Sequence, residues 1–323
     1  MVNAVTETGS GDSLPVTMIA LRVAQFGGPE AIYAEQIPVP EPAEHEVLVK
    51  VFAAGVGPWD AWIRSGNSVL PQPLPLTLGS DISGVVVALG KGTHGFAVGE
   101  AVYGVTNKRF TNGYAQYAAC RADMLARKPA SLSFVDAASV PVVAVTAWQM
   151  LFECADLKPG QRVLIHGAAG SVGRYAVQLA HAAGLFVVAT GGDNVTTELL
   201  ALGASQVIGR DLATVTKVDA AIDLVGGDSQ ASLFKFISAG GNLVSAVSNP
   251  DQTVASTHGV SAEFMLVAVD TSTLDSVRAS FDGGKLRTWV GTVLPLGRAR
   301  TAHEMMARTV SHPPGKIVLE VSH

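Results

Sequence analysis

One stretch, Arg162 to Gly184, constrains the fold of this chain most strongly. It opens with a short apolar run rich in β-branched residues, Arg162 to His166, and continues into apolar residues at helical spacing. Between the two lie Gly167, Gly170 and Gly173, in the pattern G-x-x-G-x-x-G. Glycine permits a tight turn and a close approach of the backbone to a diphosphate, and the N-terminus of a helix favours an anion. The stretch therefore predicts a strand, a glycine turn and a helix that bind a dinucleotide.

The alternative is an ordinary strand-to-helix turn whose glycines only serve packing. The fingerprint alone is weak evidence, but a second apolar strand, Leu185 to Thr190, follows the helix at once. The three elements form a β-α-β unit, and this context favours the dinucleotide site.

The composition excludes several classes of protein. With 323 residues the chain is long enough for two domains with sizeable cores. A net charge of −5 opposes binding to a phosphate backbone, so we expect no nucleic-acid partner.

Two cysteines, Cys120 and Cys154, can build neither a disulfide framework nor a four-cysteine zinc lobe, and they indicate a reducing, cytoplasmic compartment. The polar start of the chain, Met1 to Met18, lacks the apolar segment of a signal peptide, and we interpret it as a loose leader. The longest apolar run, Ala137 to Phe152, is shorter than the roughly 20 residues of a membrane span and predicts a buried helix entered at Pro141.

The remaining chain changes character near residue 137. Before it, short strands alternate with Gly- and Pro-rich connectors, which predicts a β-rich, barrel-like domain. After it, helical patterns alternate with short apolar strands, which predicts a doubly wound parallel sheet. The predicted strands are Glu46–Ala53, Asp81–Leu89, Glu100–Val105, Tyr114–Cys120, Gln206–Ile208, Ala220–Val225, Asn242–Val247 and Gly315–Val321.

The order of these motifs resembles the medium-chain dehydrogenase/reductase superfamily, and within it the zinc-free quinone oxidoreductase group. The resemblance covers about Met18 to Val321 and rests on VLVKVFAAGVGPWDAWIRSG, LTLGSDISGVV, VGEAVYG, GYAQYAA, SVPVVAVTAW, LIHGAAGSVG, IDLVGGD and GKIVLEV. It implies a GroES-like β-rich catalytic domain at residues 19–136 and 285–323 and a Rossmann NADP-binding domain at 137–284, after a leader at 1–18. It also implies a homodimer joined through the last strands of the nucleotide-binding sheet, with which the Asn242–Val247 strand is compatible.

The resemblance also bears on a catalytic metal. The positions that match the zinc ligands of zinc-dependent relatives are Gly57, Ser80 with Asp81, and approximately Val142. None carries a thiolate or an imidazole, whereas catalytic zinc needs about three protein ligands. We therefore expect chemistry without a metal, and we interpret His166 as a hydrogen-bonding residue at a strand end rather than a ligand.

The choice between NADPH and NADH is inferred from the end of the strand Leu185 to Thr190, where NAD-selective relatives carry an acid. That position is Thr190, followed by Gly191 and Gly192, which leaves room for a 2′-phosphate and favours NADPH over NADH. Asp193 could instead take a ribose hydroxyl, which favours NADH. Our hypothesis is that Arg210 supplies the phosphate contact, the alternative being a solvated loop arginine.

Further positions are implied by the resemblance. Thr146 matches a hydroxyl residue that faces the nicotinamide, although its hydroxyl could instead cap its own helical turn. Relatives carry Asn at the position of Gly57, whereas this chain has Trp59 and Trp62 nearby, which could floor a flat pocket or belong to the core. The predicted cofactor-binding residues are Gly167, Ala168, Ala169, Gly170, Ser171, Val172, Gly173, Thr146, Thr190, Gly191, Asn194, Arg210, Val225, Val247 and Ser248, and the substrate-pocket candidates are Gly57, Trp59 and Trp62.

These features predict an NADPH-dependent, zinc-independent reductase of a quinone or an α,β-unsaturated carbonyl. Without a Lewis acid, hydride transfer to an electron-poor carbon is the chemistry that remains easy. Two alternatives stay open: a reductase of another activated alkene, such as an enoyl group, and an NADPH-binding protein with vestigial catalysis.

Overall fold

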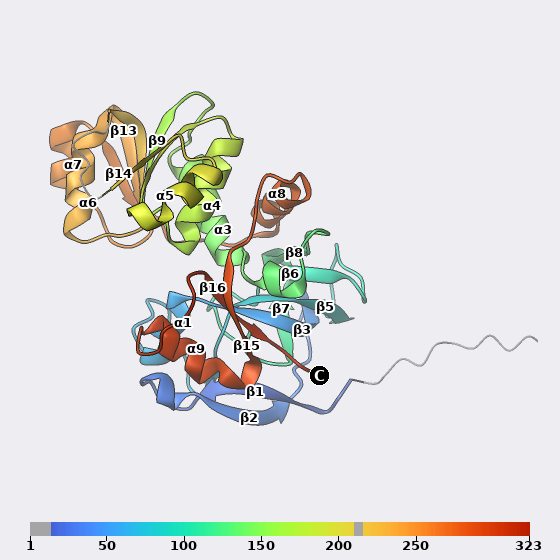
Figure 1. The fold of residues 1–323 in the computed structure, drawn as a ribbon. Coiled ribbons are helices and arrows are strands. Elements are labelled where there is room, and N and C mark those ends of the chain that lie inside the picture. The colour runs from blue at the N-terminus through green and yellow to red at the C-terminus, as the bar shows by residue number, and fades with distance from the viewer. Residues whose placement is uncertain (1–13, 210–215) are drawn as a thin grey trace, which may run out of the picture.

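The computed structural model describes residues 14–209 and 216–323. Figure 1 shows a parallel sheet flanked by helices, and below it a β-rich part that contains both the first and the last strands of the chain. Thr17 and Met18 already belong to the first strand, so the described chain is ordered into the sheet before the predicted end of the leader.

The parallel sheet has the strand order β11-β10-β9-β12-β13-β14, which is that of a doubly wound dinucleotide-binding fold. Its apolar strands are buried on both faces because helices pack against each side. The strands are β9 (Arg162–His166), β10 (Phe186–Thr190), β11 (Gln206–Ile208), β12 (Val218–Asp223), β13 (Ile237–Ser245) and β14 (Ser261–Phe264), and the helices are α4 (Ser171–Ala182), α5 (Asp193–Ala201), α6 (Asp228–Leu233) and α7 (Gln252–His258).

This sheet has an edge strand that the sequence analysis did not predict. The Asn242–Val247 segment lies mostly in β13, which pairs with β12 on one side and β14 on the other. The short strand β14 is the edge, so any sheet-to-sheet joining at this end would use Ser261–Phe264 instead.

The β-rich part holds a seven-stranded sheet in the order β15-β16-β3-β5-β6-β8, with β7 also paired to β3, and a small sheet of β2, β1 and β4. The last strands therefore return to the domain built by the first ones. The strands are β1 (Thr17–Val23), β2 (Tyr33–Pro38), β3 (Glu46–Val56), β4 (Leu76–Thr77), β5 (Asp81–Leu89), β6 (Ala101–Val105), β7 (Tyr117–Arg121), β8 (Leu125–Arg127), β15 (Val290–Pro295) and β16 (Lys316–Glu320). The helices here are α1 (Pro58–Ser65), α2 (Phe134–Ala138) and α9 (Ala299–Met306), with single 3₁₀ turns at Pro29–Ala31, Ala122–Met124 and Leu296–Arg298.

Two helices connect the parts. Helix α3 (Pro141–Trp148) begins at the predicted proline, is almost wholly buried, and continues into a π-helical turn, Gln149–Cys154. Helix α8 (Thr271–Asp282) packs against α3 and β8 (Figure 1). Its Leu274 carbonyl accepts a hydrogen bond of 2.7 Å from the Tyr103 hydroxyl, which ties it to the β-rich sheet.

Two large apolar clusters form the cores, one centred on α3 and the parallel sheet and the other inside the β-rich domain. Trp59 and Phe110 pack against both clusters while remaining partly buried. These two side chains therefore mark the junction between the domains, which is where ligands of doubly wound folds commonly bind.

Candidate active site

In the glycine turn between β9 and α4, two of the three positions require glycine, each for a different steric reason. Gly167 has φ +89°, a left-handed conformation that favours glycine. A Cβ atom on residue 173 would lie 2.3 Å from the Gly167 carbonyl oxygen, so only glycine lets the helix pack this closely. A Cβ atom on residue 170 would meet nothing closer than 3.4 Å, and the fold itself does not require glycine there.

The start of α4 carries free donors. Gly170 is its N-cap and no side chain caps the helix, so the first backbone N–H groups, at Ser171 and Val172, have no partner within the helix. The neighbouring Ala168 is buried, and the carbonyl of Ala169 accepts 3.1 Å from Arg174 Nε. The turn thus exposes donors and a positive helix end to an anion.

Arg174 holds this turn against its surroundings. Its buried guanidinium makes a bidentate ion pair with Glu198 of α5 and stacks on the ring of Trp289. Because Arg174 sits one turn into α4, these contacts fix the start of that helix relative to α5.

His166, at the end of β9, contacts the end of β10 and the first turn of α6. Ser229 Oγ donates to the Gly226 carbonyl over 2.8 Å and can accept from His166 Nε2 at 3.0 Å. On the other side, the Gly167 N–H donates to Thr190 Oγ1 over 3.0 Å, which directs the Thr190 hydroxyl hydrogen to His166 Nδ1 at 3.2 Å. These partners assign the neutral Nε2–H tautomer, and burial lowers the pKa of His166 accordingly. The prediction of a hydrogen-bonding histidine at a strand end is confirmed.

A buried carboxylate that the sequence analysis did not identify organises the end of the neighbouring strand β12. Asp223 ends β12 and is wholly buried. Its Oδ1 accepts from the N–H groups of Val225 and Gly226 at 3.1 and 3.0 Å, and its Oδ2 accepts from Gln230 Nε2 and Ser245 Oγ at 2.9 and 3.0 Å. The signal in the sequence was an acid that closes an apolar strand and is followed by Leu-Val-Gly-Gly.

This carboxylate positions three predicted residues together. Val225 and Val247 are about half exposed, at 50% and 49%, on adjacent strand ends. Ser248 is held there by Gln230 Nε2, which contacts its carbonyl oxygen at 3.1 Å and its hydroxyl at 3.2 Å. Val225 lies beside the glycine turn, since its Cγ2 would be the nearest contact of a Cβ on residue 167. Val247 and Ser248 lie next to Gly226, where a Cβ would meet Val247 Cγ1 at 2.9 Å and Ser248 Oγ at 3.1 Å.

Other predicted cofactor residues fare differently. The Thr146 hydroxyl donates to the Val142 carbonyl at 2.7 Å and is buried, so in this structure it bonds its own helix, as the alternative interpretation had it. Gly191 follows β10 and Asn194 is exposed in the first turn of α5. Arg210 lies outside the described residues.

Trp59 occupies the centre of the domain junction. A Cβ atom on Gly57 would lie 2.3 Å from two atoms of its ring, so the indole covers the backbone of residue 57. Its Nε1–H donates to Ser80 Oγ over 3.0 Å. Trp62, on the same short helix, is 55% exposed, so the structure encloses only one of the two tryptophans proposed for the pocket floor.

The residue after Trp59, the buried Asp60, anchors the first turn of α1. Asp60 Oδ2 accepts from the Gly57 N–H at 2.8 Å and from the Tyr114 hydroxyl at 2.9 Å. Burial raises the pKa of Asp60 to about 7. Tyr114 was expected to pack within a strand, but β7 begins only at Tyr117, and Tyr114 instead contributes this hydrogen bond.

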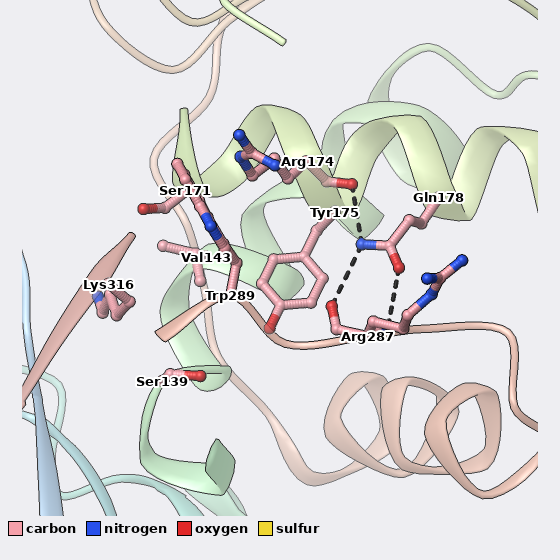
Figure 2. A pocket seen from close by; sticks show the side chains of 9 residues that line it. All are labelled: Ser139, Val143, Ser171, Arg174, Tyr175, Gln178, Arg287, Trp289 and Lys316. Carbon is pink, nitrogen blue, oxygen red and sulfur yellow. Dashed lines mark hydrogen bonds between the residues drawn. The ribbon is translucent and has the colours of Figure 1, made fainter. Parts of the chain in front are cut away.

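Figure 2 shows a small cavity between the start of α4 and the β-rich domain. Its volume of about 10 Å³ is that of roughly one water molecule. Tyr175 and Lys316 contribute polar atoms without a hydrogen-bond partner in the described chain. The lining residues are Ser139, Val143, Ser171, Arg174, Tyr175, Gln178, Arg287, Trp289 and Lys316.

Comparisons with known proteins agree with this geometry. Residues 43–130 match the family model of the alcohol dehydrogenase GroES-like domain, and residues 202–319 match that of the zinc-binding dehydrogenases. The chain is 32% identical to the quinone oxidoreductase of Homo sapiens, over 94% of this chain and 97% of that protein. It belongs to the quinone oxidoreductase group of the medium-chain dehydrogenase/reductase superfamily.

Two further relatives are a solved quinone oxidoreductase structure and an enone reductase. The structure of the quinone oxidoreductase from Coxiella burnetii superposes with a TM-score of 0.85 at 33% identity, covering 95% of this chain and all of that one. The 2-methylene-furan-3-one reductase of Solanum lycopersicum is 34% identical over 75% of this chain and 65% of its own length. The chain is thus a quinone or enone oxidoreductase of a pyridine-nucleotide-dependent family with a GroES-like and a Rossmann domain.

The residues at the family's metal positions do not fit a zinc ion. The structure brings the three positions together: Trp59 links Gly57 to Ser80, and the Val142 N–H donates to Asp81 Oδ1 at 3.3 Å. These positions offer neither thiolate nor imidazole, and their one carboxylate, that of Asp81, is engaged by Lys316 and the Val142 N–H. The indole of Trp59 lies against the backbone of Gly57. In residues 14–209 and 216–323 no group of three or more His, Cys, Asp or Glu residues is arranged to hold a metal.

A dinucleotide, by contrast, fits the residues present. The start of α4 has no side-chain cap, and the space around Gly170 is open. The half-exposed Val225 and Val247 lie at neighbouring strand ends on the same edge of the sheet. No helix in the described part of the chain combines the length and apolar character of a membrane span.

Proposed function

We propose that the protein is a zinc-independent reductase that transfers hydride from NADPH to a quinone or an α,β-unsaturated carbonyl. The observation that carries this proposal is the indole of Trp59, which covers Gly57 and bonds Ser80 at the family's metal positions. A flat aromatic surface replaces a metal there, and flat acceptors stack well on such a surface.

NADPH, when bound, supplies the hydride, and one proton from solvent completes the reduced acceptor. The protein's residues act by binding and orientation. Ser171 and Val172 offer backbone donors to the diphosphate, while Val225, Val247 and Ser248 border the cofactor's reactive half. Orienting two reactants can contribute about 7–11 kcal/mol, so a conspicuous general acid is not required.

The preference for NADPH over NADH is part of the proposal. Thr190, Gly191 and Gly192 place no carboxylate at the end of β10, which leaves the 2′-phosphate free of repulsion there. Asp193, the first residue of α5, is the opposing feature, and Arg210 is the proposed phosphate contact.

We also propose a cytoplasmic homodimer. Two cysteines, one buried and one partly buried, suit a reducing compartment. The edge strand β14 supports a dimer in which two parallel sheets join, because its outer backbone groups have no strand partner in the described chain.

The experiment is to follow NADPH oxidation with 1,4-benzoquinone, 9,10-phenanthrenequinone, a medium-chain alkenal and an enoyl thioester. Quinone or alkenal turnover supports the proposal. Turnover confined to enoyl thioesters would favour the reductase of another activated alkene. Tight NADPH binding with no turnover of any acceptor would favour vestigial catalysis.

A further inference from the structure

Lys316 is a buried cation at the domain junction that the proposed mechanism has not used. It is the first residue of β16 and only 5% exposed. Within the part of the chain that the structure describes, its Nζ makes no hydrogen bond of ordinary length, and the nearest carboxylate oxygen, Asp81 Oδ2, lies at 3.5 Å. Burying an ammonium is costly unless a counter-charge compensates it, so this ion pair needs an explanation.

The ammonium lies among the family's metal positions. Its Nζ is 4.5 Å from the centre of the Trp59 ring, which covers Gly57. Its partner Asp81 follows Ser80 directly and is anchored by the Val142 N–H at 3.3 Å. A fixed positive charge therefore stands behind the indole, where zinc-dependent relatives would hold a metal ion.

The pair also has a direction. The carboxylate of Asp81 is held toward α3 by the Val142 N–H, whereas the ammonium of Lys316 faces the indole of Trp59. The Lys316 ammonium at 3.5 Å and the Val142 N–H at 3.3 Å both favour the ionised carboxylate of Asp81. A fixed dipole with its positive end toward an acceptor stabilises negative charge as it develops there.

Negative charge develops on the acceptor during the proposed reaction. When hydride reaches a quinone or enone, two electrons enter the conjugated system and charge accumulates on the carbonyl oxygen until a proton arrives. A metal ion stabilises this charge as a Lewis acid in metal-dependent enzymes. An ammonium one aromatic ring away can supply part of the same effect in a water-poor site.

We propose that Lys316 is a positioning residue that fixes Trp59 and, through it, presents a permanent positive charge to the carbonyl oxygen of the acceptor. This inference rests on the proposed function, because it needs an acceptor stacked on Trp59. It assigns to the ammonium of this ion pair a role in the rate of reduction, beyond holding β16 to β5.

The test separates charge from stability with three variants, Lys316→Met, Asp81→Asn and the double variant. Lys316→Met leaves an uncompensated buried carboxylate and lowers the Tm, whereas the double variant removes both charges and regains most of that Tm. We expect kcat for 1,4-benzoquinone to fall about 10-fold in both variants that lack the ammonium and to stay within about threefold in Asp81→Asn. Lys128→Met is the matched control, since Lys128 lies over the ring of Phe134 at 5.5 Å, outside the residues assigned to the site.

Fluorescence gives a readout that does not depend on turnover. Lys316→Met should change the tryptophan emission of the free protein, and the same change should be absent in a Trp59→Phe background. Recovery of wild-type kcat together with Tm in the double variant would overturn the inference and leave the proposed function standing. A wild-type protein that reduces neither quinones nor enones would overturn both.

Discussion

Trp59 takes the space that any side chain at position 57 would need: a Cβ atom on Gly57 would lie 2.3 Å from Cζ2 and Cη2 of the indole. The same ring donates to Ser80 and faces Lys316. The glycine at position 57 and the tryptophan at position 59 therefore depend on each other. Where zinc-dependent relatives carry a ligand side chain, this chain has an aromatic ring.

The first prediction concerns this steric coupling. Gly57→Ala should lower the free energy of unfolding by about 1–3 kcal/mol, because the indole must move. In a Trp59→Phe background, which removes the two clashing atoms, the same change should cost less. Urea denaturation of the four proteins in a double-mutant cycle measures the difference, and equal costs in both backgrounds would show that residues 57 and 59 do not compete for space.

The second prediction separates two glycines of the fingerprint. Gly173→Ala should lower the Tm, since its Cβ would lie 2.3 Å from the Gly167 carbonyl oxygen. Gly170→Ala should lower the Tm less, since its Cβ would meet nothing closer than 3.4 Å and only the N-cap preference for glycine over alanine is lost. It should raise the Kd for NADPH about 10-fold by intruding on the diphosphate. Thermal unfolding and fluorescence titration check both, and a normal Kd in Gly170→Ala would place the diphosphate elsewhere.

The third prediction tests the source of cofactor preference. Arg210→Ala should weaken NADPH binding by roughly 10- to 100-fold and barely affect NADH, as expected for one lost charge-assisted hydrogen bond of about 1.5–3 kcal/mol. Dissociation constants for both nucleotides decide it. Equal losses for NADPH and NADH would refute a contact with the 2′-phosphate.

The fourth prediction follows from Asp60, whose burial raises its pKa from 3.8 to about 7. The folded state then binds this proton more tightly than the unfolded state, so the contribution to stability is present below about pH 4 and is lost as the pH rises through about 7. His303 acts oppositely, because burial lowers its pKa to about 3. The Tm of wild type minus that of Asp60→Asn should therefore fall between pH 4 and 7, and a flat difference profile would contradict the raised pKa.

The features that could be predicted from the sequence are those determined by short stretches of the chain. The glycine turn, the helix entered at Pro141 and the doubly wound parallel sheet each follow from a local pattern of apolar residues, glycine and proline, and the structure confirms them. The histidine at the end of β9 was likewise found from its position alone.

The contacts of the site were harder to predict because they join distant parts of the chain. Lys316 in the last strand meets Asp81 in the fifth, and Arg64 contacts His303 across 239 positions. Nothing local shows that Trp59 turns inward and Trp62 outward, since both lie on an eight-residue helix whose orientation is set by Asp60 and Tyr114. Long-range pairing decides such details, and periodicity does not report it.

The central claim is hydride transfer from NADPH without a metal. The most direct measurement is the rate of NADPH oxidation with 1,4-benzoquinone, corrected for the uncatalysed reaction, by protein treated with a chelator and shown by elemental analysis to be free of zinc. We predict the same rate as for untreated protein. A rate that disappears with the metal and returns when zinc is added would contradict the account.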